Sequence, residues 1–236
     1  MKIHLISYGD DNYTAQRENF KNSAVDSEFF DEIDVFGTKD LGNQFSTQFK
    51  DVLQLVRGGG YWIWKPYLIK KAMDKIEEND ILIYCDAGCT VNSGGKERFN
   101  QYIEQLISSE TGIISFQLDF KAYLYTKQEV FDYFNATDDI VNADLVCAGI
   151  VLYKKCAHAV MVIDKWLKAV YDDPWLFTDK LSAIPRHKQF IENRHDQSVY
   201  SIIINTYGAD KIPDETYFND FKIEGARFPF WATRLR

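Results

Sequence analysis

A carboxylate stands directly after the most apolar short run of the chain. The residues Ile81–Cys85 are followed by Asp86, Ala87 and Gly88. An apolar run of this kind is typical of a central strand that is covered on both faces, so Asp86 is predicted to lie at the carboxyl end of that strand. The small residues beside it would let a nucleotide or a metal ion approach the backbone closely. The alternative is a turn in which Asp86 only caps the next segment, because aspartate and glycine are common in turns.

Glycines and aromatic residues precede a predicted helix start in the stretch 58–66, which reads GGGYWIWKP. Pro66 fits the first turn of a helix. A helix N-terminus beside Lys65 favours a phosphate group, and the ring of Trp62 can stack on a base or a sugar. The glycine spacing matches neither phosphate-loop fingerprint. Aromatic residues that simply anchor a helix on the sheet are therefore the competing interpretation.

A third polar group, residues 193–198 with the sequence NRHDQS, comes before an apolar helical stretch. Asp196 could act as a general base or hold a sugar hydroxyl, and Arg194 could keep its carboxylate ionised. His195 and Gln197 add hydrogen-bonding groups of the kind that bind sugar hydroxyls. The alternative is that Asp196 is only the N-cap of the helix.

The composition excludes several classes of protein. The formal net charge of -8 and the even spread of Lys and Arg argue against a nucleic-acid partner. The four cysteines lack the spacing of a zinc site and are expected to be reduced thiols, as in the cytoplasm: Cys85, Cys89, Cys147 and Cys156. The N-terminus lacks the apolar length of a signal peptide, and no stretch approaches the roughly 20 residues of a membrane helix. We therefore predict a cytoplasmic protein without a transmembrane segment.

Short apolar runs alternate with amphipathic stretches along the whole chain. This alternation predicts an α/β fold in which helices flank a mostly parallel sheet. With 5 Pro and 13 Gly and no linker-like run, residues 1–236 are predicted to form a single domain. The predicted strands are Ile3–Tyr8, Ile33–Phe36, Ile81–Cys85, Gly112–Phe116 and Leu145–Tyr153. The predicted helices are Tyr13–Ala24, Phe45–Val56, one that begins at Pro66, Lys96–Ile107, one that opens with a capping box at Thr126–Glu129 and runs to Phe134, Ala157–Val170 and Arg194–Ile204.

Five segments together resemble a family of viral and bacterial glycosyltransferases with the GT-A fold, a Rossmann-related architecture. They are 59–67 (GGYWIWKPY), Asp80–Gly88, Cys147–Gly149, His195–Ser198 and Phe228–Ala232. The resemblance covers nearly the whole chain in order. It implies a transferase that moves a sugar from a nucleoside-diphosphate sugar, most of all a UDP-sugar, to a glycan or glycoconjugate acceptor, which a membrane surface could carry.

The resemblance also implies a donor site. Ser7 and Tyr8 would line the pocket for the nucleobase, while Trp62 and Lys65 would lie near the donor. Asp86 matches the first residue of the family's Asp-Xaa-Asp motif, which holds the ribose and a divalent cation, Mn²⁺ or Mg²⁺. Gly88 stands where the second aspartate belongs, and this departure puts the metal in question.

For the sugar and the acceptor, the resemblance implies contacts from His195, Gln197 and Gly149. Asp196 is the first candidate for the catalytic carboxylate, with Asp144 and then Asp119 behind it. In an inverting reaction this carboxylate would deprotonate the acceptor hydroxyl, whereas in a retaining reaction it would orient the sugar. The sequence does not choose between these two outcomes.

Two other functions fit part of the pattern. Asp86–Val91 after an apolar strand partly resembles the nucleophile loop of haloacid-dehalogenase phosphatases, although the second aspartate of that loop is missing. A non-catalytic module that binds nucleotides or carbohydrates is the second alternative, because Gly88 disrupts the metal motif. The sugar, the nucleotide, the acceptor and the oligomeric state are left open.

Overall fold

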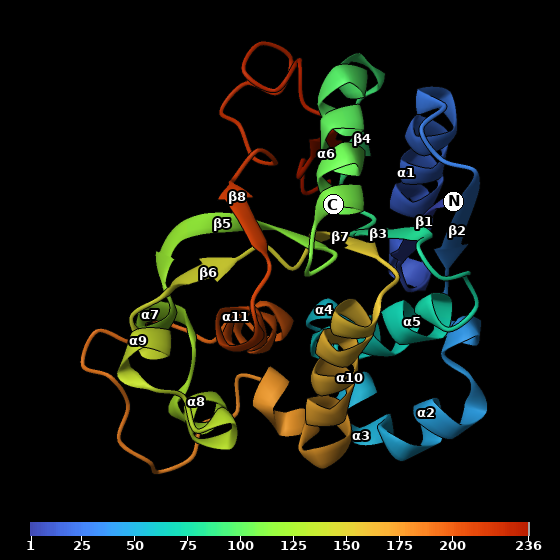
Figure 1. Ribbon diagram of the computed structural model, residues 1–236. Coiled ribbons are helices and arrows are strands. Elements are labelled where there is room, and N and C mark those ends of the chain that lie inside the picture. The colour runs from blue at the N-terminus through green and yellow to red at the C-terminus, as the bar shows by residue number, and fades with distance from the viewer. Residues whose placement is uncertain (236) are drawn as a thin grey trace.

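Seven strands form one central sheet in the computed structural model, which describes residues 1–235 (Figure 1). The strand order is β2-β1-β3-β7-β5-β6, and β8 pairs with β5. The pairings make β7 and β6 antiparallel to the other strands of this sheet, which all run one way. The bounds are β1 Ile3–Tyr8, β2 Glu32–Phe36, β3 Ile81–Cys85, β5 Ile113–Lys121, β6 Asp144–Val146, β7 Ile150–Lys154 and β8 Asp210–Pro213. The predicted α/β class with a mostly parallel sheet is confirmed.

Helices cover both faces of the sheet (Figure 1). On one face lie α1 and α6, and on the other lie α5, α10 and α11. Their bounds are α1 Thr14–Ser27, α5 Trp64–Met73, α6 Lys96–Ser108, α10 Ala157–Asp172 and α11 Asp196–Tyr207. The shorter helices are α2 Asn43–Gln48, α3 Lys50–Leu53, α4 Gly58–Tyr61, α7 Ala122–Tyr125, α8 Gln128–Phe134 and α9 Asp138–Val141. Single 3-10 turns are η1 Asp11–Tyr13, η2 Thr38–Leu41, η3 Ser93–Gly95 and η4 Pro174–Phe177.

The central strand β3 supplies both hydrophobic cores. Ile81 and Ile83 pack with the helices α1 and α6, whereas Leu82 and Tyr84 face α5, α10 and α11. Successive side chains of a strand point to opposite faces, so a continuous apolar run fits only a strand that is buried on both sides. The prediction for Ile81–Cys85 is therefore confirmed, and Asp86 lies at the carboxyl end of β3.

Two predicted elements are broken in the structure. The stretch predicted as one strand, Leu145–Tyr153, forms β6 and β7 with a turn at Cys147–Gly149 between them. The helix predicted over Phe45–Val56 is divided into α2 and α3 at Phe49, whose φ of -106° and ψ of 20° leave the helical region. Both errors arise because apolar periodicity continues across a local change of backbone direction.

The capping box predicted at the start of α8 does not form. The hydroxyl of Thr126 is buried without a partner, and Lys127 is the residue at the N-cap. Glu129 Oε1 instead accepts a hydrogen bond from the backbone N–H of Ser182, at 2.5 Å. A tertiary contact with a distant loop has replaced the local one.

The glycine-rich stretch before α5 turns in the left-handed sense. Gly58, Gly59 and Gly60 have φ values of 60°, 55° and 95°, and Tyr61 and Trp62 follow with 55° and 59°. For residues with a side chain this conformation costs about 1–2 kcal/mol each, which explains the glycines. At Gly60 a Cβ would also lie 2.6 Å from Leu53 Cα. The turn carries Tyr61 and Trp62 toward the start of α11.

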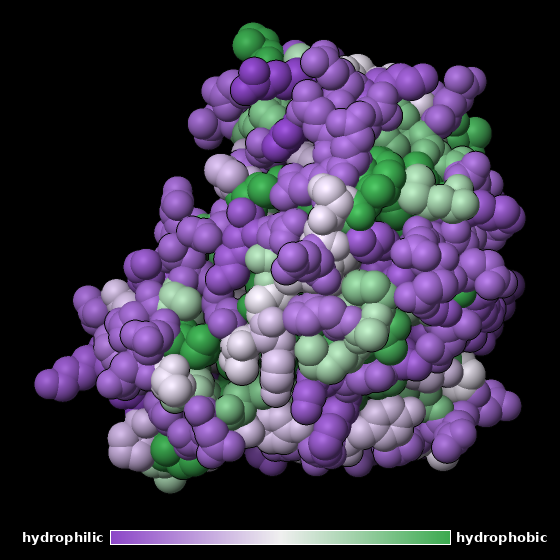
Figure 2. All heavy atoms as spheres, in the orientation of Figure 1, coloured by the Kyte–Doolittle hydropathy of each residue, from purple (hydrophilic) through white to green (hydrophobic). Residues whose placement is uncertain are grey.

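Hydrophilic residues predominate on the face of the molecule that Figure 2 shows, with apolar residues in scattered groups. Within residues 1–235 no helix combines the length and the apolar character needed to cross a membrane. All four cysteines are free thiols, three of them buried, as the sequence predicted.

Candidate functional site

A buried lysine joins two carboxylates that are far apart in the sequence. Lys65 Nζ lies 3.2 Å from Asp86 Oδ1 and 2.5 Å from Asp196 Oδ2. Lys65 belongs to the first turn of α5, Asp86 follows β3, and Asp196 is the first residue of α11. Three of the segments that the sequence analysis singled out therefore meet at the carboxyl ends of β1 and β3, where open α/β sheets bind their ligands.

Lys65 itself has no proton left for a ligand. Its ammonium donates to Asp196, contacts Asp86 and donates to the carbonyl of Ala148 at 3.1 Å. An ammonium carries only three protons, and the residue is 1% exposed. To bind a donor phosphate, as the sequence analysis expected, the ammonium of Lys65 would have to give up one of these three partners.

Asp86 is the accessible member of the group, with 37% of its side chain exposed. Tyr84 donates its hydroxyl to Asp86 Oδ1 at 2.5 Å. The backbone N–H of Asp86 donates to the carbonyl of Gly149 at 2.8 Å. A Cβ on Gly149 would lie 2.8 Å from Asp86 Oδ2. Gly149 therefore belongs to the site because it leaves room for the carboxylate.

Burial and the neighbouring charges shift the pKa values of Asp196, Lys65 and Tyr84. The net effect of burial, which raises the pKa of Asp196, of Lys65, which lowers it, and of the Asp86 carboxylate, which raises it, is a pKa of about 6. Burial acts to lower the pKa of Lys65, but the two carboxylates outweigh it and hold that pKa above its usual value. Burial and Asp86 also raise the pKa of the Tyr84 phenol. Lys65 and Tyr84 are therefore fully protonated at neutral pH.

The residues around Asp86 do not fit a protein-built site for Mn²⁺ or Mg²⁺. Among residues 1–235 no three His, Cys, Asp or Glu side chains converge on a common point. One oxygen of Asp86 already receives Tyr84 and contacts Lys65, and the nearest second carboxylate, Asp196, is bound to the same ammonium. A divalent cation prefers several oxygen ligands, and here an ammonium occupies the space between the two carboxylates.

Gly88, at the position of the missing second aspartate, lies beneath the C-terminal tail. The tail follows β9 (Phe230–Trp231), which pairs with β4 (Thr90–Val91). The carbonyl of Gly88 accepts hydrogen bonds from Leu235 N at 3.0 Å and Thr233 Oγ1 at 2.9 Å. A Cβ here would lie 3.2 Å from Leu235 O. A side chain here would require the tail to shift by a few tenths of an ångström, which gives a packing reason for the glycine. Ala87, beside it, is buried.

Ser7 and Tyr8 do not form one wall of a pocket. Ser7 is fully buried and its hydroxyl has no partner within the described residues. Tyr8 is 4% exposed and its ring lies 4.0 Å from that of Trp64, in the core under the opposite face of the sheet. Successive strand residues point to opposite faces, so only one of the two could face a given ligand.

Asp144 and Asp119 lie away from the group around Asp86. Asp144 is on β6, three strands from β3, and pairs with Lys121 at 2.7 Å. At about 4.8 Å between neighbouring strands, this separation places it well beyond contact. Asp119 is an exposed residue on β5. Asp196 alone of the three candidate carboxylates joins the site.

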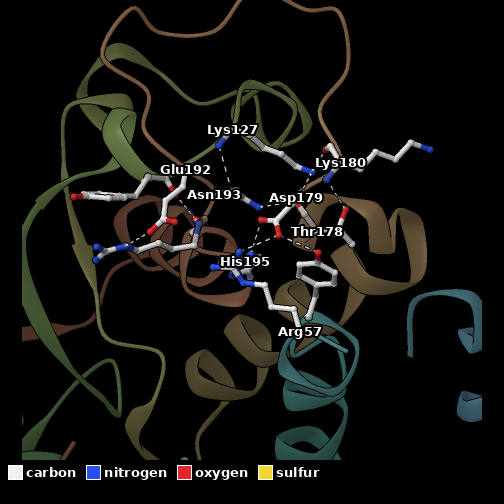
Figure 3. A network of polar contacts seen from close by, with 12 residues as sticks. Arg57, Lys127, Thr178, Asp179, Lys180, Glu192, Asn193 and His195 are labelled. Atoms are coloured by element: carbon white, nitrogen blue, oxygen red, sulfur yellow. Dashed lines mark hydrogen bonds and ion pairs between the residues drawn. The ribbon is translucent and has the colours of Figure 1, made fainter. Parts of the chain in front are cut away.

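His195 joins the site through a second network, drawn in Figure 3. Its Nε2 lies 2.9 Å from Asp179 Oδ1, and the other oxygen of Asp179 accepts from Tyr61 at 2.9 Å and Arg57 at 3.0 Å. The imidazole packs against the rings of Tyr61 and Trp62, with centroids 5.1 and 5.3 Å away. Trp62 therefore reaches the start of α11 as part of this network.

Arg194 differs from expectation, whereas the predicted contact of Gln197 with the sugar stays a prediction. Arg194 does not pair with Asp196, because its guanidinium stacks on the ring of Tyr125 at 3.7 Å. The cation that pairs with Asp196 is Lys65 instead. Gln197 is half-buried, and its backbone N–H bonds to Arg194 O at 3.1 Å.

The structure also adds residues that the sequence analysis missed. Tyr84 could have been found from the sequence, because it is two residues before Asp86 and strand alternation places both residues on one face. No sequence pattern pointed to Asp179, because it lies in an irregular segment and its partners Arg57 and His195 belong to other segments of the chain.

Comparison with known structures shows the same architecture. Over 98% of this chain and 93% of the other, it is similar to a glycosyltransferase involved in the glycosylation of the major capsid of PBCV-1, with 11% identity and a TM-score of 0.57. It is also similar to the bifunctional glycosyltransferase WbbM, over 92% of this chain and 39% of that one, with 9% identity and a TM-score of 0.50. The chain has the fold of GT-A glycosyltransferases. The sequence matches no protein-family model, and it gives no match among curated proteins.

The contact between Gly149 and Asp86 predicts the effect of one methyl group. Gly149→Ala should lower the free energy of unfolding by about 1–3 kcal/mol, the usual range for overpacking, because the Asp86 carboxylate must leave its present position. Urea denaturation would measure the loss, and a crystal structure would show the carboxylate moved. Gly94→Ala is the matched control. Its Cβ would lie 3.1 Å from Ala226 O, and this contact is outside the site. Equal stability of Gly149→Ala and the wild type would contradict the crowding.

The raised pKa of Asp196 predicts a pH dependence of stability. Its pKa rises from 3.8 to about 6 on folding, so the folded state binds a proton more tightly than the unfolded state. That contribution is complete below about pH 4 and is lost as the pH rises through about 6. Relative to Asp196→Asn, the wild type should therefore gain up to about 3 kcal/mol on acidification from pH 7 to pH 4. Urea denaturation at both pH values measures this gain. If the difference in unfolding free energy between the wild type and Asp196→Asn is the same at both pH values, Asp196 titrates normally.

Proposed function

We propose that the protein is a glycosyltransferase that moves a sugar from a nucleoside-diphosphate sugar, with UDP as the expected nucleotide, to a glycan or glycoconjugate acceptor. The observation that carries the proposal is the exposed carboxylate of Asp86 at the carboxyl end of β3, joined through Lys65 to Asp196. The GT-A fold supports it, because open sheets of this kind bind ligands at that edge. Fold alone does not establish an activity, so the site residues must be tested directly.

In this proposal Asp86 binds the donor. Tyr84 and Lys65 hold one of its oxygens, which fixes the orientation of the carboxylate. The other oxygen, Oδ2, faces Gly149 and is the acceptor available for a ribose hydroxyl. A group that is held in place before the ligand arrives loses little entropy on binding.

The leaving diphosphate must be stabilised as its charge grows. Lys65 is fully engaged, so this charge must come from elsewhere. The tail brings Arg234 to the same turn, with its Cα 3.6 Å from the position of a Cβ on Gly88. Arg234 is an exposed residue whose guanidinium lies 4.9 Å from the ring of Tyr217. A phosphate at Gly88 can attract this cation, and we assign it to the diphosphate.

Asp196 we assign to the transferred sugar rather than to proton transfer. Its Oδ2 already accepts the Lys65 ammonium at 2.5 Å, and the residue is 6% exposed. A proton placed on this carboxylate would give up its attraction to Lys65. Its fixed negative charge suits a sugar hydroxyl or the positive charge that develops at the anomeric carbon.

The phosphatase alternative lacks a residue that it requires. Its second aspartate would stand at Gly88, where a Cβ would lie only 3.2 Å from the carbonyl oxygen of Leu235 in the tail. A binding module without catalysis needs only the donor site, and turnover distinguishes it from the transferase.

The proposal is tested with a panel of nucleotide sugars and the variant Asp86→Asn. A ligand that binds the folded state raises the melting temperature, and we expect UDP-sugars to do so. Asp86→Asn keeps the bonds to Tyr84 and Lys65 and should melt near the wild-type temperature while losing at least about tenfold in turnover, or about 1.4 kcal/mol.

Asp74→Asn is the control, because Asp74 pairs with Lys70 on the surface and is remote from the site. No binding of any nucleotide sugar by the wild type would refute the proposal. If Asp86→Asn unfolds easily but transfers sugar normally, Asp86 has only a structural role in the turn.

A further inference from the structure

His195 occupies a backbone conformation that normally requires glycine. Its φ of 58° and ψ of -121° are those of the first central residue of a type II′ turn. The hydrogen bond from Gln197 N to Arg194 O, at 3.1 Å, closes that turn. A side chain here costs on the order of 1–3 kcal/mol, and such strain concentrates at functional sites. The position therefore keeps an imidazole at a cost in stability.

Asp179 fixes which nitrogen of that imidazole carries the proton. Its Oδ1 lies 2.9 Å from Nε2, and an ionised carboxylate can only accept. Nε2 must therefore donate, which leaves Nδ1 as an unprotonated acceptor in the neutral ring. Nδ1 makes no hydrogen bond within the described part of the chain, and 6% of the His195 side chain is exposed. The lone pair of Nδ1 is available to a ligand.

The ring lies on the same edge of the sheet as the donor site. Its neighbour in sequence is Asp196, which Lys65 links to Asp86. The left-handed turn that carries Tyr61 and Trp62 against the ring also passes the end of β1, where a Cβ on Gly59 would meet Asp10 Oδ2 at 3.1 Å. The turn thus spans from the end of β1 to His195.

We propose that the Asp179–His195 pair is the general base of the transfer reaction and that the acceptor hydroxyl binds at His195 Nδ1. This inference rests on the glycosyl transfer proposed above. The acceptor oxygen forms the new bond to the anomeric carbon, and the bond from that carbon to the diphosphate oxygen breaks with its electron pair on the diphosphate. The hydroxyl proton passes to Nδ1, and Asp179 stabilises the imidazolium until the proton is lost to solvent. A base in this role implies inversion at the anomeric carbon.

Burial keeps the imidazole neutral before it reacts. Burial lowers the pKa of His195, and Asp179 opposes that shift; Arg57 lowers it further, whereas Glu192 raises it. Burial acts to raise the pKa of Asp179, but hydrogen bonds from His195 and Tyr61 outweigh it and the net shift is downward. Transfer should therefore decline only below the ordinary titration range of histidine.

The test is His195→Gly with added imidazole. Glycine suits the positive φ, so the variant relieves strain and should fold. It also leaves a space beside Asp179, Tyr61 and Trp62 into which free imidazole fits. We expect UDP affinity within a few-fold of the wild type, transfer lower by roughly a hundredfold or more, and at least about tenfold recovery with imidazole. Recovery should follow the neutral fraction of imidazole as the pH changes, and the product should show inverted configuration by NMR.

Glu28→Gly is the matched control, since Glu28 also has a positive φ of 55° but lies at the end of α1. It should transfer sugar at the wild-type rate. Transfer by His195→Gly within a few-fold of wild type, a folded variant that imidazole does not restore, or retained configuration would each overturn the base assignment. A wild type that transfers no sugar would instead refute the proposed function, so the two failures are distinguishable.

Discussion

The site depends on one buried ammonium held between two carboxylates. Lys65 is 1% exposed, and such a charge is tolerable only because Asp86 and Asp196 lie 3.2 and 2.5 Å away. Removing the ammonium would typically cost about 3–5 kcal/mol, since the buried Asp196 carboxylate would be left uncompensated. The three residues come from α5, the end of β3 and the start of α11, so this interaction fixes where two helices stand relative to the central strand.

A second set of contacts depends on that arrangement. With α11 placed by Asp196, the strained turn at His195 faces the left-handed turn that carries Tyr61 and Trp62. Asp179 joins the two through hydrogen bonds to His195, Tyr61 and Arg57. Asp179 is itself in an irregular segment. Lys127 holds that segment with bonds to the carbonyls of Thr178 and Lys180 (Figure 3) and to the carbonyl of Trp175. Backbone strain on both sides is thus balanced by polar contacts that neither segment could make alone.

The same geometry explains why the Asp-Xaa-Asp pattern is incomplete. Where the motif would place a second carboxylate, Gly88 accepts two hydrogen bonds from the C-terminal tail. The first carboxylate is matched to an ammonium instead of a cation with several oxygen ligands. The departure at Gly88 and the buried Lys65 are therefore two parts of one arrangement, in which positive charge is built into the chain at this edge of the sheet.

The sequence by itself determined the α/β class and the central strand Ile81–Cys85, and its resemblance to a family singled out three segments that meet in the structure, 58–66, 80–88 and 193–198. The class and the strand rest on local rules, such as the apolar run of a doubly covered strand. Only the tertiary structure decided which polar groups meet. It engaged Lys65 with carboxylates rather than leaving it for a phosphate, separated Asp144 from the site, and brought Asp179 to His195. These outcomes depend on distances between residues that are far apart in the chain, and periodicity and spacing carry no information about such distances.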